Sequence, residues 1–220
     1  MIRVVLVDDQ HLVRMGLTML CESASDVEIV GEASNGHEAV RLATQLLPDV
    51  ILMDLHMPGM DGVTATARIM AARPGTRVLA LTTFDDDDHL YPALAAGACG
   101  FVVKDTPPGE LLDAVRRAAD GDSPFSQTAL NRLVDQAVRS HDTPCQAPTA
   151  PLPTLSPRER EVLTLVAAGH SNQEIAHRLH LGVTTVKTHI SSLMTKTGTP
   201  NRIRLAVLAV RAGITDPPQT

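Results

Sequence analysis

Three aspartates and one lysine stand at the ends of short apolar runs in this sequence. Asp8 and Asp9 follow IRVVLV, and Asp54 ends DVILMD. Lys104 follows GFVV. If these runs are parallel strands of one sheet, their carboxyl ends meet at one edge, where open α/β sheets bind ligands. Carboxylates so close together require a cation, and the lysine beside them requires an anion. The pattern therefore predicts a divalent metal and phosphoryl chemistry in one pocket.

The first 122 residues alternate between strand and helix patterns five times. Apolar runs of strand length predict strands over 2–8, 27–33, 49–54, 76–82 and 98–103. The segments between and after them predict helices over 11–22, 36–46, 62–73, 87–96 and 108–120. Pro92 falls inside the fourth of these helices, which it is expected to kink or delay. Near-continuous apolar strands separated by helices are typical of a parallel sheet covered on both faces.

The pattern changes after residue 122. Residues 123–139 carry one more amphipathic helical pattern, and 140–153 contain four prolines and almost nothing large and apolar. The second of these segments predicts a flexible linker. Residues 154–215 read as wholly helical, with one helix from the SPRE cap to Gly169 and others over 171–180, 184–196 and 201–212. A second, compact domain of four helices is expected there.

Charge is distributed unevenly along the 220 residues, although the formal net charge is only −6. Residues 1–122 carry 9 Lys and Arg against 19 Asp and Glu. Residues 154–220 carry 8 against 4. The basic second domain is therefore the one expected to contact a polyanion.

The three cysteines, Cys21, Cys99 and Cys145, are far apart and odd in number. They predict neither a disulfide framework nor a zinc site, and they are expected to be free thiols in a reducing compartment. The start of the chain lacks the basic region and long apolar stretch of a signal peptide. No apolar run approaches the roughly 20 residues that span a bilayer. We therefore expect a cytoplasmic protein without membrane contact.

Residues 1–122 resemble the receiver domain of bacterial two-component response regulators. The resemblance rests on residues at successive strand ends and on one loop: Asp8, Asp9, Asp54, the loop MPGMDG over 57–62, Thr82 and Lys104. It implies a flavodoxin-like fold, in which a five-stranded parallel sheet carries helices on both faces. It also implies that the domain accepts a phosphoryl group from a sensor histidine kinase.

The resemblance implies a role for each residue of the pocket. Asp54 would be the phosphoacceptor. Asp8 and Asp9, with the Asp54 carboxylate and the main-chain carbonyl of His56, would hold Mg²⁺. This assignment agrees with the chemistry, because phosphoryl transfer depends mainly on positioning and on neutralising the charge of the phosphoryl oxygens.

By the same resemblance, Thr82 would hydrogen-bond the new phosphoryl oxygen and Lys104 would pair with it. Phe101 would be the aromatic switch that follows Thr82 inward. A competing interpretation is a phosphatase of the haloacid-dehalogenase type, which also uses a nucleophilic aspartate. That class needs a second aspartate two residues further on, and residue 56 is histidine here. The general acid is therefore missing, and the sequence favours a signalling protein over an enzyme.

Residues 155–209 resemble the LuxR-type helix-turn-helix, and the combination resembles the NarL/FixJ family of response regulators. SNQEIA over 171–176 would belong to the scaffold helix, and TTVKTHI over 184–190 would begin the recognition helix. The segment HLGV over 180–183 would form the turn between them, glycine included.

Apolar residues of the recognition helix recur at helical spacing and are expected to face the bundle: Val186, Ile190, Leu193 and Met194. The predicted DNA contacts are the polar residues Thr184, Thr185, Lys187, Thr188, His189, Ser191, Ser192 and Lys196. Among them, Lys187, His189 and Lys196 are phosphate candidates, because they can carry positive charge. Thr188 and Ser191 are short enough to read base edges. The alternative is a protein-binding bundle with a solvated basic face.

The last helix, 201–212, resembles the dimer-forming helix of this family, with Ile203, Val207 and Leu208 as the expected contacts. Two copies would present two recognition helices about one DNA turn apart, which predicts a homodimer on a roughly palindromic operator. We expect a transcriptional regulator whose receiver masks the DNA-binding domain until Asp54 is phosphorylated. The alternative is a regulator that binds DNA whatever the state of Asp54 and uses its receiver only to dimerise.

Overall fold

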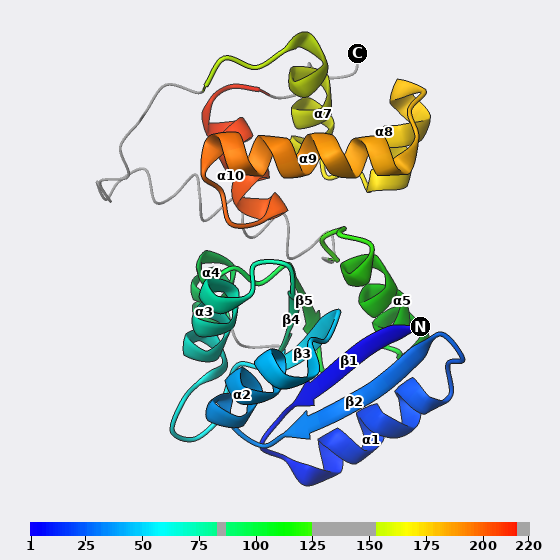
Figure 1. Ribbon diagram of the computed structural model, residues 1–220, viewed down its shortest axis with the longest axis vertical. Helices are drawn as coiled ribbons and strands as arrows, with labels where there is room; N and C mark the ends of the chain where they lie inside the picture. The colour runs from blue at the N-terminus through cyan, green and yellow to red at the C-terminus, as the bar shows by residue number, and fades with distance from the viewer. Residues whose placement is uncertain (83–86, 125–152, 215–220) are drawn as a thin grey trace. The chain divides into compact units, whose positions relative to one another are not determined.

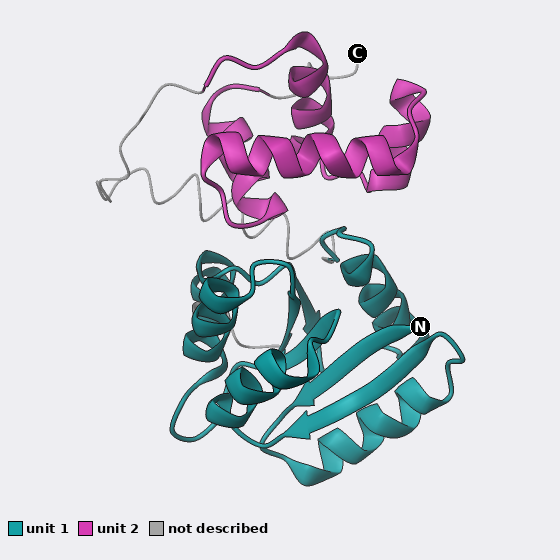
Figure 2. Cartoon of the chain, viewed as in Figure 1, with its two compact units in different colours: residues 1–125 teal, residues 126–220 magenta. Residues whose placement is uncertain are grey.

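The computed structural model describes residues 1–82, 87–124 and 153–214 (Figure 1). The chain divides into two compact units, Met1–Phe125 and Ser126–Thr220 (Figure 2). Most of the predicted helix over 123–139 and of the predicted linker over 140–153 lies outside the described residues. The predicted domain boundaries therefore stay predictions. Among the described helices, none is long and apolar enough to cross a membrane.

The first unit contains a five-stranded parallel sheet with helices on both faces (Figure 1). Its strands are β1 (Ile2–Val7), β2 (Val27–Ala33), β3 (Val50–Asp54), β4 (Arg77–Thr82) and β5 (Gly100–Val103). They lie in the order β2-β1-β3-β4-β5. β2 therefore lies on one side of β1, and β3, β4 and β5 follow in order on its other side. The predicted fold class is confirmed, and each strand begins and ends within two residues of its predicted run.

The helices of the first unit are α1 (His11–Glu22), α2 (Gly36–Leu46), α3 (Gly62–Ala72), α4 (Asp87–Ala96) and α5 (Pro108–Ala119). Local side chains fix two of the helix starts. Asn35 accepts a hydrogen bond from the amide of Glu38 at 3.0 Å, and Asp61 accepts one from the amide of Thr64 at 2.6 Å. α4 continues through Pro92 as one helix of ten residues.

Alternate residues of the central strands enter opposite cores. In β1, Val4 and Leu6 belong to the apolar cluster that includes residues of α1 and α5. Val5 and Val7 belong to the cluster that includes residues of α2 and α3. Because both faces of the sheet are buried, the strands read as continuous apolar runs in the sequence.

The second unit contains α7 (Pro157–Ala167), α8 (Asn172–Leu179), α9 (Val183–Thr197) and α10 (Arg202–Arg211). α7 and α8 each begin with a capping box, in which Ser156 pairs with Glu159 and Ser171 pairs with Glu174. The four helices share one apolar cluster: Val162, Leu163, Leu165, Val166, Ile175, Ala176, Val186, Ile190, Leu193, Leu205 and Ala209, joined by Ile214. The predicted compact helical bundle is confirmed.

The turn between α8 and α9 lies where the sequence predicted it. His180 ends α8 in the left-handed conformation at φ 51°, whereas Gly182 precedes α9 with an extended backbone at φ −74°. The left-handed residue of this turn is therefore histidine and not the glycine. Histidine tolerates this conformation better than a β-branched residue does.

Candidate functional site

The carboxyl ends of four strands bring the predicted pocket residues together. Asp8 follows β1, Asp54 is the last residue of β3, Thr82 is the last residue of β4, and Lys104 follows β5. The parallel register pairs Val7 with Met53 and Thr82 with Val103. Neighbouring strands therefore end at nearly the same level, and their terminal side chains share one edge of the sheet.

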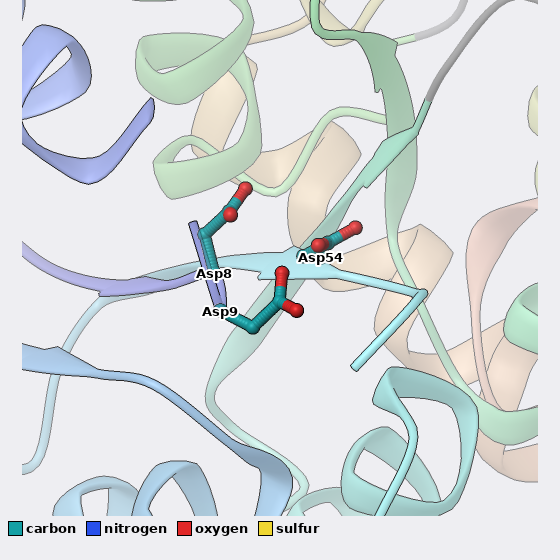
Figure 3. Close-up of side chains that lie close together, drawn as sticks. All are labelled: Asp8, Asp9 and Asp54. Atoms are coloured by element: carbon teal, nitrogen blue, oxygen red, sulfur yellow. The ribbon is translucent and has the colours of Figure 1, made fainter. Parts of the chain in front are cut away.

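Three carboxylates form the centre of this pocket (Figure 3). One oxygen from each of Asp8, Asp9 and Asp54 can be chosen so that all three atoms lie within 4.8 Å of one another. Asp8 and Asp54 are buried, whereas Asp9 is exposed. The cluster therefore has a closed side against the sheet and an open side at Asp9.

Lys104 bridges the two buried carboxylates. Its Nζ atom lies 2.6 Å from Oδ2 of Asp8 and 3.0 Å from Oδ2 of Asp54. Burial would lower the pKa of Lys104, but the two carboxylates more than reverse this effect and raise the pKa. Burial raises the pKa of Asp54 above its usual value, and the ammonium of Lys104 opposes that shift. Lys104 thus stabilises the ionised form of a carboxylate that burial destabilises.

Backbone groups hold the two buried carboxylates in place. Oδ1 of Asp8 accepts a hydrogen bond from the amide of Gln10 at 2.8 Å, and Oδ1 of Asp54 accepts one from the amide of His56 at 3.2 Å. The guanidinium of Arg14, one turn into α1, donates to the main-chain carbonyl of Asp8 at 2.6 Å. Sequence reasoning missed Arg14, because its contact depends on how α1 packs beside β1.

Gly62 is required by the close approach of α3 to the end of β3. A Cβ atom at this position would lie 2.1 Å from the carbonyl oxygen of Asp54 and 2.8 Å from Cα of Leu55. Both neighbours are backbone atoms and cannot move aside cheaply. The sequence marked Gly62 as a helix start but gave no sign that it permits this packing.

The two predicted switch residues lie on adjacent strands. Thr82 is buried, and its carbonyl accepts a hydrogen bond from the amide of Lys104 at 2.7 Å. Phe101 is half-buried on β5, where it pairs with Ala80. Its amide donates to the carbonyl of Pro124 at 3.1 Å, so the segment that follows α5 is hydrogen-bonded to β5.

The predicted recognition helix α9 has one apolar and one polar face. Val186, Ile190 and Leu193 are buried in the cluster of the second unit, and Met194 packs against that cluster. Five of the predicted DNA-contacting residues are exposed: Thr184, Thr185, Thr188, Ser191 and Lys196. Lys187 and His189 are half-buried. The inward and outward residues therefore separate as the helical spacing predicts.

Two of the predicted DNA contacts, Lys196 and Ser192, also lie close to a carboxylate of the same unit. Nζ of Lys196 lies 2.6 Å from Oε1 of Glu159, and Oγ of Ser192 donates to the same oxygen at 3.4 Å. Glu159 belongs to the first turn of α7 and is 5 % exposed. The sequence predicts that Glu159 caps the start of α7, but it gives no sign of the contacts with Lys196 and Ser192.

α10 contributes to the interior of the second unit through Leu205 and Ala209. Of the residues predicted to form a dimer contact, Ile203 is buried, whereas Val207 and Leu208 are half-buried. The dimer role of these three residues stays a prediction.

Both units match known protein families. Residues 4–116 match the response regulator receiver domain, and residues 153–209 match the bacterial regulatory proteins of the luxR family. The transcriptional regulatory protein LiaR of Bacillus subtilis is 41 % identical over 211 residues, which are 96 % of this chain and 98 % of LiaR.

Solved structures agree with these matches. The response regulator ChrA of a heme-sensing two-component system is 34 % identical, with a TM-score of 0.53, over 97 % of this chain and 98 % of ChrA. RcsB, solved as two dimers bound to two parallel DNAs, is 27 % identical, with a TM-score of 0.55, over 96 % of this chain and 98 % of RcsB. The chain belongs to the two-component response regulators of the NarL/FixJ type, a family of DNA-binding transcriptional regulators with a receiver domain and a LuxR-type helix-turn-helix.

Proposed function

We propose that Asp54 accepts a phosphoryl group from a sensor histidine kinase and that the phosphorylated chain binds promoter DNA as a homodimer. The observation that carries the proposal is the contact between a buried aspartate and a lysine at the ends of β3 and β5. Nζ of Lys104 lies 3.0 Å from Asp54, whose carboxylate shares the pocket with Asp8 and Asp9. A nucleophile, a fixed cation and two further carboxylates are the groups that phosphoryl transfer to an aspartate requires.

In the proposed reaction, a carboxylate oxygen of Asp54 forms a bond to phosphorus. The bond between phosphorus and the imidazole nitrogen of the kinase histidine breaks, and that nitrogen keeps the electron pair. The aspartyl side chain gains about one negative charge. Lys104 is the cation already beside this side chain, so it would pair with the phosphoryl oxygens.

The pocket residues fit Mg²⁺, because the donor set consists of hard oxygen ligands. Asp8, Asp9 and the Asp54 carboxylate would hold the ion, together with the main-chain carbonyl of His56. When bound, the ion would neutralise charge on the phosphoryl oxygens. The hydrogen bonds from Gln10 to Asp8 and from His56 to Asp54 keep the protein's own ligands oriented.

The ends of β4 and β5 would change position when Asp54 is phosphorylated. Thr82 and Lys104 are joined by a backbone hydrogen bond, so a movement of either residue toward the phosphoryl group affects both strands. Phe101, three residues before Lys104, would change position with Thr82. This is the route by which the modification would alter the face formed by α4, β5 and α5.

The proposed DNA contacts lie on the polar face of α9. Thr188 and Ser191 are exposed and would read base edges, while Lys187 and His189 would contact phosphates with Thr184 and Thr185 at the helix start. The basic charge of residues 154–220 supports this role. RcsB, solved as dimers on DNA, supports a homodimer and therefore a roughly palindromic operator.

The test compares operator affinity with and without a small phosphodonor, in the wild type and in Asp54→Asn. We expect the phosphodonor to tighten binding by the wild type and to have no effect on the variant. A matched control is Glu22→Gln, because Glu22 is an exposed carboxylate at the end of α1, away from the pocket. Equal affinity in all cases would instead support the regulator that binds DNA whatever the state of Asp54.

A further inference from the structure

The first turn of α7 contacts both helices of the helix-turn-helix. Glu159 divides its two carboxylate oxygens between a local and a distant role. Oε2 accepts hydrogen bonds from the amide and the hydroxyl of Ser156, at 2.9 and 3.0 Å, and so completes the cap of α7. Oε1 accepts hydrogen bonds from Nζ of Lys196 at 2.6 Å and from Oγ of Ser192 at 3.4 Å. One carboxylate therefore fixes the start of α7 to the last two turns of α9.

The adjacent Arg158 makes the matching contact with α8. Its guanidinium donates to the main-chain carbonyl of Leu179 at 2.6 Å. Leu179 is the last residue of α8, where carbonyl groups lack partners within the helix. Arg158 and Glu159 thus hold the end of α8 and the end of α9 to the same turn of α7, and they restrict the angle between the two helices.

The burial of Glu159 decides which contact Lys196 keeps. The side chain of Glu159 is 7 % exposed, so water has little access to its carboxylate, whereas the side chain of Lys196 is 43 % exposed. If Lys196 turned toward a DNA phosphate, it would leave a buried carboxylate without its cation. Removing one partner from such a pair is strongly unfavourable.

We infer that Lys196 is a positioning residue of the DNA-binding domain, which acts through Glu159 to orient α9 and does not neutralise a DNA phosphate. The inference rests on the proposed DNA-binding role of α9. It replaces the prediction that Lys196 is a phosphate contact, and it makes Glu159 a determinant of DNA affinity although Glu159 carries the same sign of charge as DNA.

The test measures how the DNA affinity of the full-length chain depends on salt. The probe is a duplex that the wild type, treated with acetyl phosphate and Mg²⁺, selects from a random-sequence pool. Each residue that neutralises a phosphate contributes about 0.9 to the slope of log affinity against log salt. Lys196→Gln and Glu159→Gln are each expected to weaken binding about tenfold and to leave this slope at the wild-type value. Lys187→Gln is expected to reduce the slope by about 0.9.

Three further variants complete the design. The double variant of Glu159→Gln and Lys196→Gln should bind about as well as either single variant, because each substitution removes the same contact. Lys196→Arg keeps the charge and should recover most of the affinity. Arg160→Gln makes the same charge change as Lys196→Gln at an exposed residue of α7, and it should leave affinity near the wild-type value.

The outcomes separate the inference from the function on which it rests. A reduced slope for Lys196→Gln, or losses that add up in the double variant, would overturn the positioning role. If Glu159→Gln loses its helical circular dichroism signal, that variant has unfolded. The positioning role is then judged from the salt dependence of Lys196→Gln alone. A wild type without salt-dependent binding would overturn the DNA-binding function, and the positioning role with it.

Discussion

The Nζ atom of Lys104 lies 3.0 Å from Oδ2 of Asp54, the proposed phosphoacceptor. The same ammonium lies 2.6 Å from Asp8. A lysine of the protein therefore already neutralises the carboxylates to which a divalent ion would bind. Its position has two opposite consequences: it favours a phosphoryl group on Asp54, and it opposes the binding of a second cation before phosphorylation.

Removal of this ammonium is expected to strengthen metal binding. In Lys104→Met, Mg²⁺ should bind about tenfold more tightly, because a repelling positive charge is lost from the pocket. Isothermal titration of the full-length chain without a phosphodonor measures the affinity. Lys104→Arg keeps the charge and should show a smaller change. Weaker Mg²⁺ binding by Lys104→Met would contradict the prediction.

Gly62→Ala is expected to lower the free energy of unfolding of the first unit by about 2–3 kcal/mol. The added methyl group would lie 2.1 Å from the carbonyl oxygen of Asp54. Gly16→Ala is the matched control, since Gly16 lies inside α1 and an added Cβ there would meet no atom within 4 Å. That change should raise stability by about 0.5–1 kcal/mol. Denaturant unfolding of both variants gives the comparison, and equal effects would rule out the proposed clash.

The stability contributed by Glu159 is expected to depend on pH. The hydrogen bond from Lys196, followed by those from Ser156, lowers the pKa of the Glu159 carboxyl to about 2. In the unfolded chain a glutamate titrates near about 4.3. Because the folded pKa is depressed, the stabilisation is fully present above the unfolded pKa and is lost as the pH falls toward the folded one.

This dependence can be measured as the difference in unfolding midpoint between the wild type and Glu159→Gln. The difference should be largest near neutral pH and should shrink steadily below about pH 4.3. A difference that stays constant down to the acid limit of folding would show that the charge of Glu159 is irrelevant to its contribution.

Two buried thiols are expected to resist alkylation in the folded chain. Burial raises the pKa of Cys21 to about 11 and that of Cys99 to about 12. Since the thiolate is the reactive form, iodoacetamide at mildly alkaline pH should modify both residues slowly until the first unit unfolds. Peptide mass spectrometry with and without denaturant measures the rates. Equal rates in the two conditions would contradict the burial of these side chains.

Much of the fold could be predicted because its signals are local. Both faces of the sheet are buried at its centre, so β3 is a continuous apolar run up to Asp54, and caps such as Ser156 mark helix starts within a few residues. The sequence located the turn between α8 and α9 but not its backbone conformation, in which His180 is left-handed and Gly182 is extended. Tertiary packing of the two helices selects between such alternatives.

The pocket could be predicted for a topological reason. Parallel strands place their carboxyl ends at one edge, so residues at those ends, such as Asp8, Asp54 and Lys104, must meet wherever the chain order puts them. The sequence by itself therefore determined which side chains share the pocket and what chemistry they favour.

Only the tertiary structure decided the contacts that depend on how helices pack. Arg14 reaches the carbonyl of Asp8, and Lys196 reaches Glu159 across 37 residues of chain, without any periodicity in the sequence that marks either pair. The spacing within α9 makes Lys196 a basic residue near the polar face, which suggests DNA. The packing of α7 against α9 places its ammonium 2.6 Å from Glu159, a contact that no spacing within α9 could indicate.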